Sequence, residues 1–200
     1  MPDRITAMAS TPLTRLQEQQ YLEIERAAQQ RSECFRGEML AIPHGTVNHA
    51  RIQRNLLIAI GGRLAAVCEA FGSDLRIKVE SSGLYTYPDL SIVCGPIAYL
   101  DQRKDTILNP SVLIEVLSPS TESYDRGRKF QHYQTIATLR EYILVSQSEM
   151  RVERFSRSGD TWTLRTYAGS DAVMCIDAAG LVVPLQEIYQ RVEFEDEAVE

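Results

Sequence analysis

Val112-Leu113-Ile114-Glu115-Val116-Leu117 is the stretch of sequence that decides the fold of this chain. A strand that is almost wholly apolar is typical of the centre of a sheet covered on both faces. Glu115 interrupts the run, and burying an unpaired carboxylate costs several kcal/mol. We therefore expect Glu115 to be paired, protonated or bound to a metal ion. The alternative is a carboxylate at the strand edge that reaches solvent, or a buried salt bridge.

The pattern on both sides of this strand predicts an α/β (mixed α+β) fold, in which helices flank a mixed β-sheet. We expect helices from Thr11-Pro12 to about residue 28 and over 48–71, 125–137 and 185–192. We expect a hairpin over 32–42 with its turn at 36–37. The predicted strands are 75–80, 89–94, 112–117, 141–146, 151–155 and 161–167, and a turn at 156–160 joins the last two. Neither a repeat nor a Pro/Gly/Ser-rich linker appears, so we expect a flexible N-terminus over 1–11, one domain over 12–194 and an acidic tail over 195–200.

The formal net charge of −6 argues against a protein that clamps nucleic acid over a broad basic face. Basic residues are instead grouped locally at Arg51, Arg54 and Arg63, and at Arg126, Arg128 and Lys129. Binding of nucleic acid would therefore be local and assisted by a metal ion, or nucleic acid is not the ligand.

Cysteine usage and apolar run length bear on the compartment. The longest apolar run, 56–60, is too short to span a bilayer, and the N-terminus lacks the features of a signal peptide. The cysteines Cys34, Cys68, Cys94 and Cys175 are dispersed and form no CxxC pair. We expect them to be buried, reduced thiols, which predicts a cytoplasmic protein without a zinc cluster.

Asp89 follows Pro88 at the start of another apolar strand. Taken alone, an aspartate after a proline at the start of a strand indicates a residue that stabilises a turn. Together with Glu115, however, it puts two carboxylates on neighbouring strands. Mg²⁺ commonly takes one or two protein carboxylates together with water and phosphate, so the pair predicts a site for Mg²⁺ or Mn²⁺.

Lys129 has helical spacing to apolar residues of its own segment. Lys129, Tyr133 and Ile136 lie at i, i+4 and i+7, on the stripe that should face the sheet. A lysine on such a stripe needs an anionic partner, whereas a lysine on a solvated face does not. We expect the first arrangement.

Two further residues are weaker candidates. Glu38 follows the turn of the N-terminal hairpin and could complete a metal shell, although a surface glutamate is equally consistent with the sequence. His49 begins the long second helix and could serve as a base or contact a phosphate, but a histidine at a helix start is more often structural.

Several motifs together resemble one family. They are Tyr85-Thr86-Tyr87-Pro88-Asp89, Asn109-Pro110-Ser111-Val112, Glu115-Val116-Leu117-Ser118-Pro119-Ser120-Thr121, Tyr124-Asp125-Arg126-Gly127-Arg128-Lys129, Leu139-Arg140-Glu141-Tyr142 and Arg36-Gly37-Glu38. In combination they resemble the Uma2-type family of putative restriction endonucleases (DUF820), over about 16–194. That family is similar to the PD-(D/E)xK nucleases, which implies a restriction-endonuclease-like fold.

The resemblance implies that the chain is a metal-dependent endonuclease acting on DNA. Asp89 matches the aspartate of the PD motif and Glu115 the acidic residue of (D/E)xK, but the lysine position holds Leu117. Lys129 is the expected substitute for that lysine. Asp89 and Glu115, with the Val116 carbonyl, would hold Mg²⁺ or Mn²⁺, and Lys129 would orient the attacking water or help to deprotonate it.

Glu38 would hold a bridging water or a second metal ion, while His49, Arg126 and Arg128 would contact the nucleic acid. Cutting a duplex needs one active site per strand, so we also expect a homodimer. The rival hypothesis is a catalytically inactive, nuclease-like module for nucleic-acid binding or protein assembly, which the acidic charge and the missing (D/E)xK lysine favour.

Overall fold

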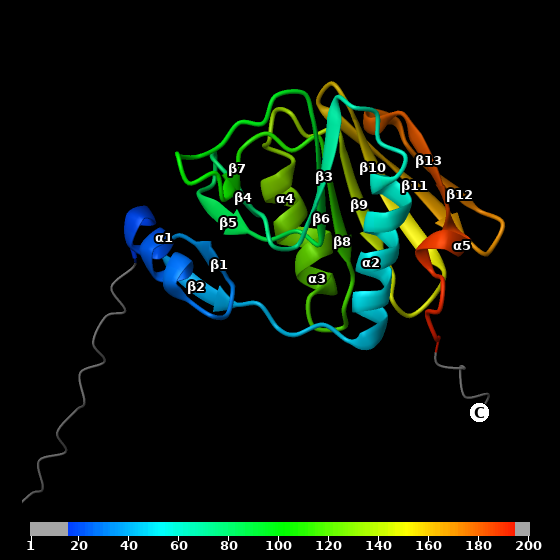
Figure 1. Cartoon of the computed structure of the whole chain (residues 1–200), viewed down its shortest axis with the longest axis horizontal. Helices are drawn as coiled ribbons and strands as arrows, with labels where there is room; N and C mark the ends of the chain where they lie inside the picture. Colours follow the sequence, from blue (N-terminus) through cyan, green and yellow to red (C-terminus); the bar gives the residue numbers. More distant parts are fainter. Residues whose placement is uncertain (1–15, 195–200) are drawn as a thin grey trace, which may run out of the picture.

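The computed structural model describes residues 16–194, which fold into helices packed around mixed sheets (Figure 1). The six-stranded sheet runs, from edge to edge, through β11 (Thr161–Ala168), β10 (Arg151–Ser158), β9 (Glu141–Val145), β8 (Val112–Val116), β6 (Leu90–Cys94) and β3 (Cys68–Gly72). Strand β8 pairs parallel with β9 and antiparallel with β6, so the sheet is mixed. The predicted fold class is therefore confirmed.

Two smaller sheets and the helices complete the fold. The five-stranded sheet has the order β2 (Glu38–Ala41), β1 (Ser32–Phe35), β5 (Leu84–Thr86), β4 (Arg76–Val79) and β7 (Thr106–Ile107), and the two-stranded sheet pairs β12 (Val173–Ile176) with β13 (Leu181–Pro184). The helices are α1 (Glu18–Ala27), α2 (Val47–Gly61), α3 (Glu122–Tyr124), α4 (Phe130–Tyr133) and α5 (Leu185–Ile188), with a π-helical turn η1 (Asp125–Lys129) and a 3₁₀ turn η2 (Asp177–Ala179).

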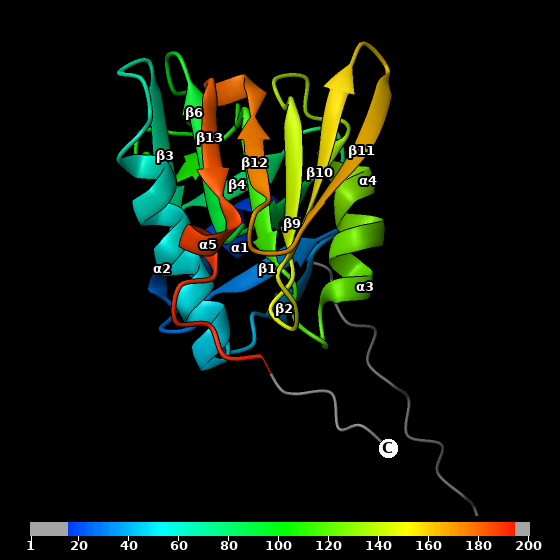
Figure 2. The ribbon, with the colours of Figure 1, turned by 90° about the vertical axis from the view of Figure 1, so that its right-hand side faces the viewer.

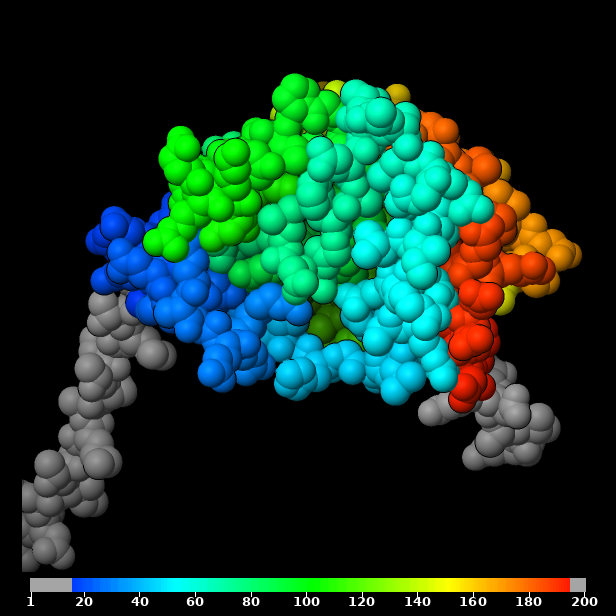
Figure 3. Space-filling model, in the orientation of Figure 1, coloured from blue at the N-terminus to red at the C-terminus, as the bar shows by residue number. Residues whose placement is uncertain are grey.

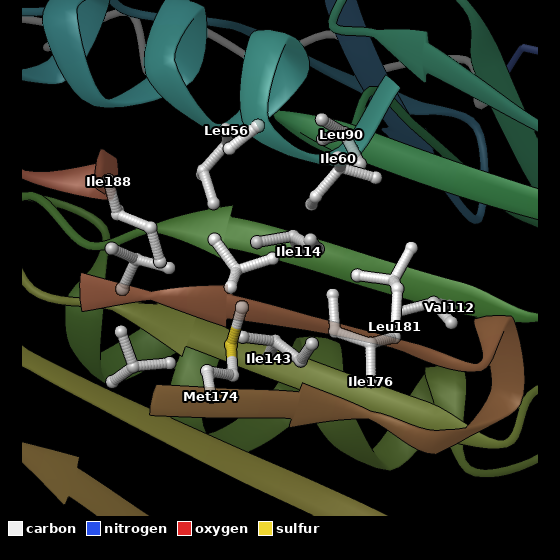
Figure 4. Close-up of a cluster of buried hydrophobic side chains, with 14 of the residues drawn as sticks. Leu56, Ile60, Leu90, Val112, Ile114, Ile143, Met174, Ile176, Leu181 and Ile188 are labelled. Atoms are coloured by element: carbon white, nitrogen blue, oxygen red, sulfur yellow. The ribbon is translucent and has the colours of Figure 1, made fainter. Parts of the chain in front are cut away.

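The six-stranded sheet is covered on both faces, as the apolar β8 predicts. Helices α2 and α5 and the β12–β13 hairpin cover one face (Figure 2). Figure 4 shows how Leu56 and Ile60 of α2 pack toward Ile114 and Val112 of β8 in this layer. The segment α3–η1–α4 and the five-stranded sheet pack on the opposite face.

The side chains of β8 alternate between these two layers. Val112, Ile114 and Val116 belong to the α2 layer, whereas Leu113 and Leu117 belong to the layer of α4. Because residues two apart in a strand share a face, Glu115 points toward α4 with Leu113 and Leu117. The sheet thus directs the carboxylate of Glu115 at the helix that carries Lys129.

Some predicted boundaries are wrong. The helix expected over 48–71 ends at Gly61, and Cys68–Gly72 forms the edge strand β3, because two consecutive glycines end the helix. The helix expected over 125–137 is a π-helical turn followed by one turn of α-helix that ends at Tyr133. Helix α1 begins at Glu18, and the start predicted at Thr11-Pro12 lies outside the described residues.

The expectation of four reduced thiols is also wrong. Cys68 of β3 and Cys94 of β6 face each other across the antiparallel pair and form a disulfide. Cys34 and Cys175 are free thiols. The disulfide removes cysteine usage as an argument for a reducing compartment. Within residues 16–194, no helix has the length and apolar character needed to cross a membrane.

Candidate functional site

A cavity of about 580 Å³ opens at the edge of the six-stranded sheet where β6 begins and β8 ends. It lies between the segment 40–46, the start of α2 and the segment 116–129, and Figure 3 shows a hollow between the 40–46 segment and α2. Its size is within the usual range of ligand sites, roughly 300–1,000 Å³. Acidic lining residues come from four elements or their ends: Glu33, Asp89, Glu115 and Asp125.

Asp89 and Glu115 converge at the floor of this cavity. Strands β6 and β8 are antiparallel with Leu90 opposite Ile114, so the next pair outward is Asp89 and Glu115. The Val116 backbone N–H donates a hydrogen bond to Asp89 Oδ2 at 2.6 Å. The predicted placement of the two carboxylates on neighbouring strands is therefore what the sheet register produces.

Lys129 enters the same cavity from η1, and its side chain is only 7% exposed. Its Nζ lies 3.0 Å from Glu115 Oε1, 3.2 Å from Asp125 Oδ1 and 3.3 Å from Glu33 Oε1. Tyr133 and Ile136 are also buried, which confirms the stripe predicted from the i, i+4, i+7 spacing. The amine thus reaches the face of Glu115 and Leu117 from the helix.

Three members of the site were missed by sequence reasoning. Glu33 and Asp125 flank Lys129, and Tyr133 donates a hydrogen bond from its hydroxyl to Glu115 Oε1 at 2.9 Å. Asp125 has one sequence signal that could have found it, because it lies four residues before Lys129 in a predicted helix. Glu33 alternates with Ser32 and Cys34 in a short strand and carries no such signal.

The cavity holds more carboxylates than cations, and this shifts the pKa of its groups. Burial, with the negative charges of Asp125 and Asp89, raises the pKa of Glu115 well above its usual range, against the opposing charge of Lys129. Burial likewise raises the pKa of Asp125. Burial alone would lower the pKa of Lys129, but Glu115 and the other acidic groups around it raise that pKa well above its usual range.

Asp89 is held by the start of α2 as well as by β8. Gln53 Nε2 donates a hydrogen bond to Asp89 Oδ1, and His49 Nε2 lies 3.3 Å from Asp89 Oδ2. Burial lowers the pKa of His49. The interactions with Asp89 and with the backbone of Val116 together raise this pKa by more than burial lowers it, so the net shift is upward. His49 therefore lies between two of the groups predicted to hold a metal ion.

Gly45 lets the chain pass directly over the His49 ring. A Cβ at position 45 would lie 2.9 Å from Nδ1 of His49, which is closer than real Cβ contacts. The N-cap of α2 is Thr46, whose side chain accepts a hydrogen bond from the backbone N–H of His49. Glycine at 45 and threonine at 46 together fix where the imidazole lies.

Three other predicted site residues lie outside the cavity lining. Glu38 is exposed on β2, opposite Phe35, and the glutamate that the hairpin brings to the cavity is Glu33. Arg126 forms ion pairs with Glu122, four residues earlier, and with the buried Glu153 of β10. Arg128 is exposed on the same segment.

The acidic side chains of the site are numerous but are not gathered into a metal centre of three or more ligands. In the part of the chain that the structure describes, no group of three or more His, Cys, Asp or Glu side chains is arranged to hold a metal ion. A cation between Asp89 and Glu115 would therefore take its other ligands from a backbone carbonyl and from water, which is how proteins commonly hold Mg²⁺.

Comparison with a family model identifies the family. The family Uma2, described as "Putative restriction endonuclease", matches residues 18–186. Two proteins of Synechocystis sp. are similar: the uncharacterized protein slr1290 is 34% identical over 92% of this chain and 97% of its own length, and the uncharacterized protein sll1609 is 35% identical over 76% and 88%. A crystal structure described as a putative nuclease belonging to DUF820, from Anabaena variabilis, covers 86% of this chain and 96% of its own with a TM-score of 0.70. At 18% identity this likeness shows the fold.

Proposed function

We propose that this chain, which belongs to the Uma2 family of putative restriction endonucleases, is a metal-dependent endonuclease that hydrolyses phosphodiester bonds of DNA. One observation carries the proposal. Asp89 and Glu115 meet at the floor of a cavity, and Lys129 lies 3.0 Å from Glu115 although it comes from a different element. Two carboxylates can hold a divalent cation and an ammonium can stabilise developing charge, so this set of groups suits metal-assisted phosphodiester hydrolysis.

The charges around the cavity fit a divalent cation. Four carboxylates line it, Lys129 is the one lysine or arginine among its lining residues, and the pKa of Glu115 is raised by burial beside Asp125 and Asp89. Such a cluster lacks positive charge, and hard oxygen ligands suit Mg²⁺ or Mn²⁺. Asp89, Glu115 and the Val116 carbonyl would hold the cation, which when bound polarises the scissile phosphate.

The protein groups have separate tasks in this proposal. Asp89 is positioned by the Val116 N–H and by Gln53, so its carboxylate has a fixed orientation toward the cavity. Lys129, whose pKa is raised by the surrounding carboxylates, remains an ammonium at neutral pH. It therefore acts as a donor that orients the attacking water and stabilises the charge developing on the phosphate, and not as the base.

A cleavage screen tests the function. The full chain is incubated with labelled single- and double-stranded DNA and RNA, with Mg²⁺, with Mn²⁺ and with EDTA. We expect metal-dependent cleavage of DNA that is lost in Asp89→Ala, Asp89→Asn and Glu115→Gln. Retention of full cleavage by any of these variants would exclude the two-carboxylate site.

The alternative function is a nuclease-like module that binds or assembles without catalysis. The specific observation that favours it is Leu117, which occupies the position of the (D/E)xK lysine and is buried in the core. A metal-binding enzyme gains thermal stability when Mg²⁺ or Mn²⁺ binds its folded state, whereas a module without a metal site does not. A melting temperature that is unchanged by either cation, together with no cleavage, would favour the module.

A further inference from the structure

The cavity by itself offers little to hold a polyanion. Apart from His44 and His49, its only basic lining residue is Lys129, which already lies within 3.3 Å of three carboxylates. Proteins bind nucleic acid largely through cationic contacts to phosphate groups. If the substrate is nucleic acid, the groups that hold its backbone must lie beside the cavity.

A seam between the β1–β2 hairpin and the helical segment leads away from the cavity. Glu33 and Phe35 share a face of β1; Glu33 reaches Lys129 and the Phe35 ring lies 4.7 Å from the ring of His132. The seam therefore runs from the cavity at the Glu33–Lys129 pair to the hairpin turn that follows Phe35.

Two arginines lie at the outer end of this seam. Arg36 occupies the hairpin turn with a φ of 51°, and its guanidinium lies 5.0 Å from the centre of the Phe35 ring. Arg128 is exposed and immediately precedes Lys129. Burial and then the charges of Arg36 and Arg128 lower the pKa of His132, so both guanidinium groups lie near one imidazole.

Both arginines lack a carboxylate partner in the described part of the chain. Between residues 16 and 194, no carboxylate forms an ion pair with Arg36 or Arg128, whereas the adjacent Arg126 is paired with both Glu122 and Glu153. Two exposed guanidinium groups beside one imidazole can bind an anion in place of a protein carboxylate. On a chain with a net charge of −6, this local excess of positive charge points to an anionic ligand.

We infer that Arg36, Arg128 and His132 form a backbone-binding surface, which receives phosphate groups of the nucleic acid beside the cavity. The substrate class in this inference rests on the proposed function. The two guanidinium groups can each form paired hydrogen bonds to phosphate oxygens, and the neutral imidazole can donate one more. The ring contact with Phe35 and the fixed turn conformation preorganise Arg36 and His132 for this contact.

Binding without cleavage tests the inference separately from catalysis. Fluorescence anisotropy is measured in EDTA with fluorescein-labelled single- and double-stranded DNA oligonucleotides and the full chain, over a series of NaCl concentrations. The test variant is Arg36→Asn with Arg128→Gln, because asparagine tolerates the left-handed backbone of position 36. We expect the Kd to rise about tenfold. We expect the slope of log K against log salt, which is negative, to fall in magnitude by about 1.5, since each phosphate contact contributes roughly 0.7–0.9.

The matched control removes two positive charges elsewhere. Arg140 and Arg165 are exposed, outside the cavity lining, and Arg140→Gln with Arg165→Gln should bind with the parent's salt slope. Equal losses in both double variants, parental binding by the Arg36–Arg128 variant, or no binding by the parent would each overturn the surface. Parental cleavage lost in Glu115→Gln, with unchanged binding by the Arg36–Arg128 variant, would leave the proposed function standing without this surface. Weakened binding in the test variant, without any cleavage by the parent, would support this surface and contradict the proposed function.

Discussion

Replacement of Lys129 by Met removes the single ammonium from among three carboxylates, of which Glu115 and Asp125 are buried. Its Nζ lies 3.0–3.3 Å from Glu115, Asp125 and Glu33, and the side chain is 7% exposed. Deleting one partner of a buried ion pair costs about 3–5 kcal/mol, because the remaining charge stays buried without compensation. For a chain of this size each kcal/mol lowers Tm by about 2–4 °C, so we expect a fall of roughly 6–20 °C at pH 8.

The loss should become smaller as the pH falls. Burial raises the pKa of Glu115 and of Asp125 in the folded chain, and Lys129 is the charge that opposes both shifts. A carboxyl whose folded pKa is raised stabilises the protein fully below its unfolded pKa, and this contribution is lost as the pH rises through the folded pKa. Without Lys129 both shifts grow, so Lys129→Met should approach the parent's stability at pH 5 and diverge from it toward pH 8.

Calorimetry of parent and variant between pH 5 and pH 8 measures both effects. Arg63→Met is the control, because the side chains of Arg63 and its partner Glu187 are 41% and 40% exposed, and such pairs contribute about 1 kcal/mol or less. A Lys129→Met variant that melts within two degrees or so of the parent at every pH would refute the reasoning. It would mean that the three carboxylates do not depend on this lysine.

Four further outcomes are expected. If the proposed catalytic role of Lys129 is correct, Lys129→Met lowers turnover in a cleavage assay by roughly two to four orders of magnitude. Adding Leu117→Lys to this variant should restore part of the lost turnover. Full activity in Lys129→Met would contradict the catalytic role. Glu115→Gln should melt at the same temperature as the parent or higher without metal, because three carboxylates surround one ammonium, and a lower Tm would argue against this excess of negative charge. Reduction of the Cys68–Cys94 disulfide, which spans 26 residues, should destabilise the fold by roughly 3–4 kcal/mol, seen as a lower Tm with dithiothreitol but no change in a Cys68→Ser, Cys94→Ser variant. Light scattering at tens of micromolar should show a homodimer if the chain cuts duplexes, and a monomer with intact cleavage would contradict this.

Much of the site could be predicted because burial of charge leaves a trace in the sequence. Glu115 stands inside an apolar strand, and Lys129 shares a helical stripe with Tyr133 and Ile136, so each had to have a partner. Their mutual contact at 3.0 Å satisfies both expectations at once. Strand β8 is paired along both edges and covered on both faces, and the cover on both faces is what its apolar pattern predicts.

What could not be predicted depends on pairing between distant segments. Glu33 belongs to a four-residue strand, and only the docking of the β1–β2 hairpin against the helix brings it to Lys129. The disulfide between Cys68 and Cys94 requires the register of β3 against β6, and β3 itself was hidden in an expected helix. The short strands β5, β7, β12 and β13 lack enough residues to show a period.

The carboxylates around Lys129 belong to three elements that form independently: Glu33 to a hairpin, Asp125 to a π-helical turn and Glu115 to the central sheet. Local opening of a short helix costs less free energy than unfolding of the whole chain. If the segment that carries Asp125 and Lys129 detaches briefly, an ammonium and a carboxylate leave together, while Glu115 stays in the sheet. Amide hydrogen exchange over residues 122–133 would therefore report how often this segment opens and the site is incomplete. A melting curve reports global unfolding and does not detect this local opening.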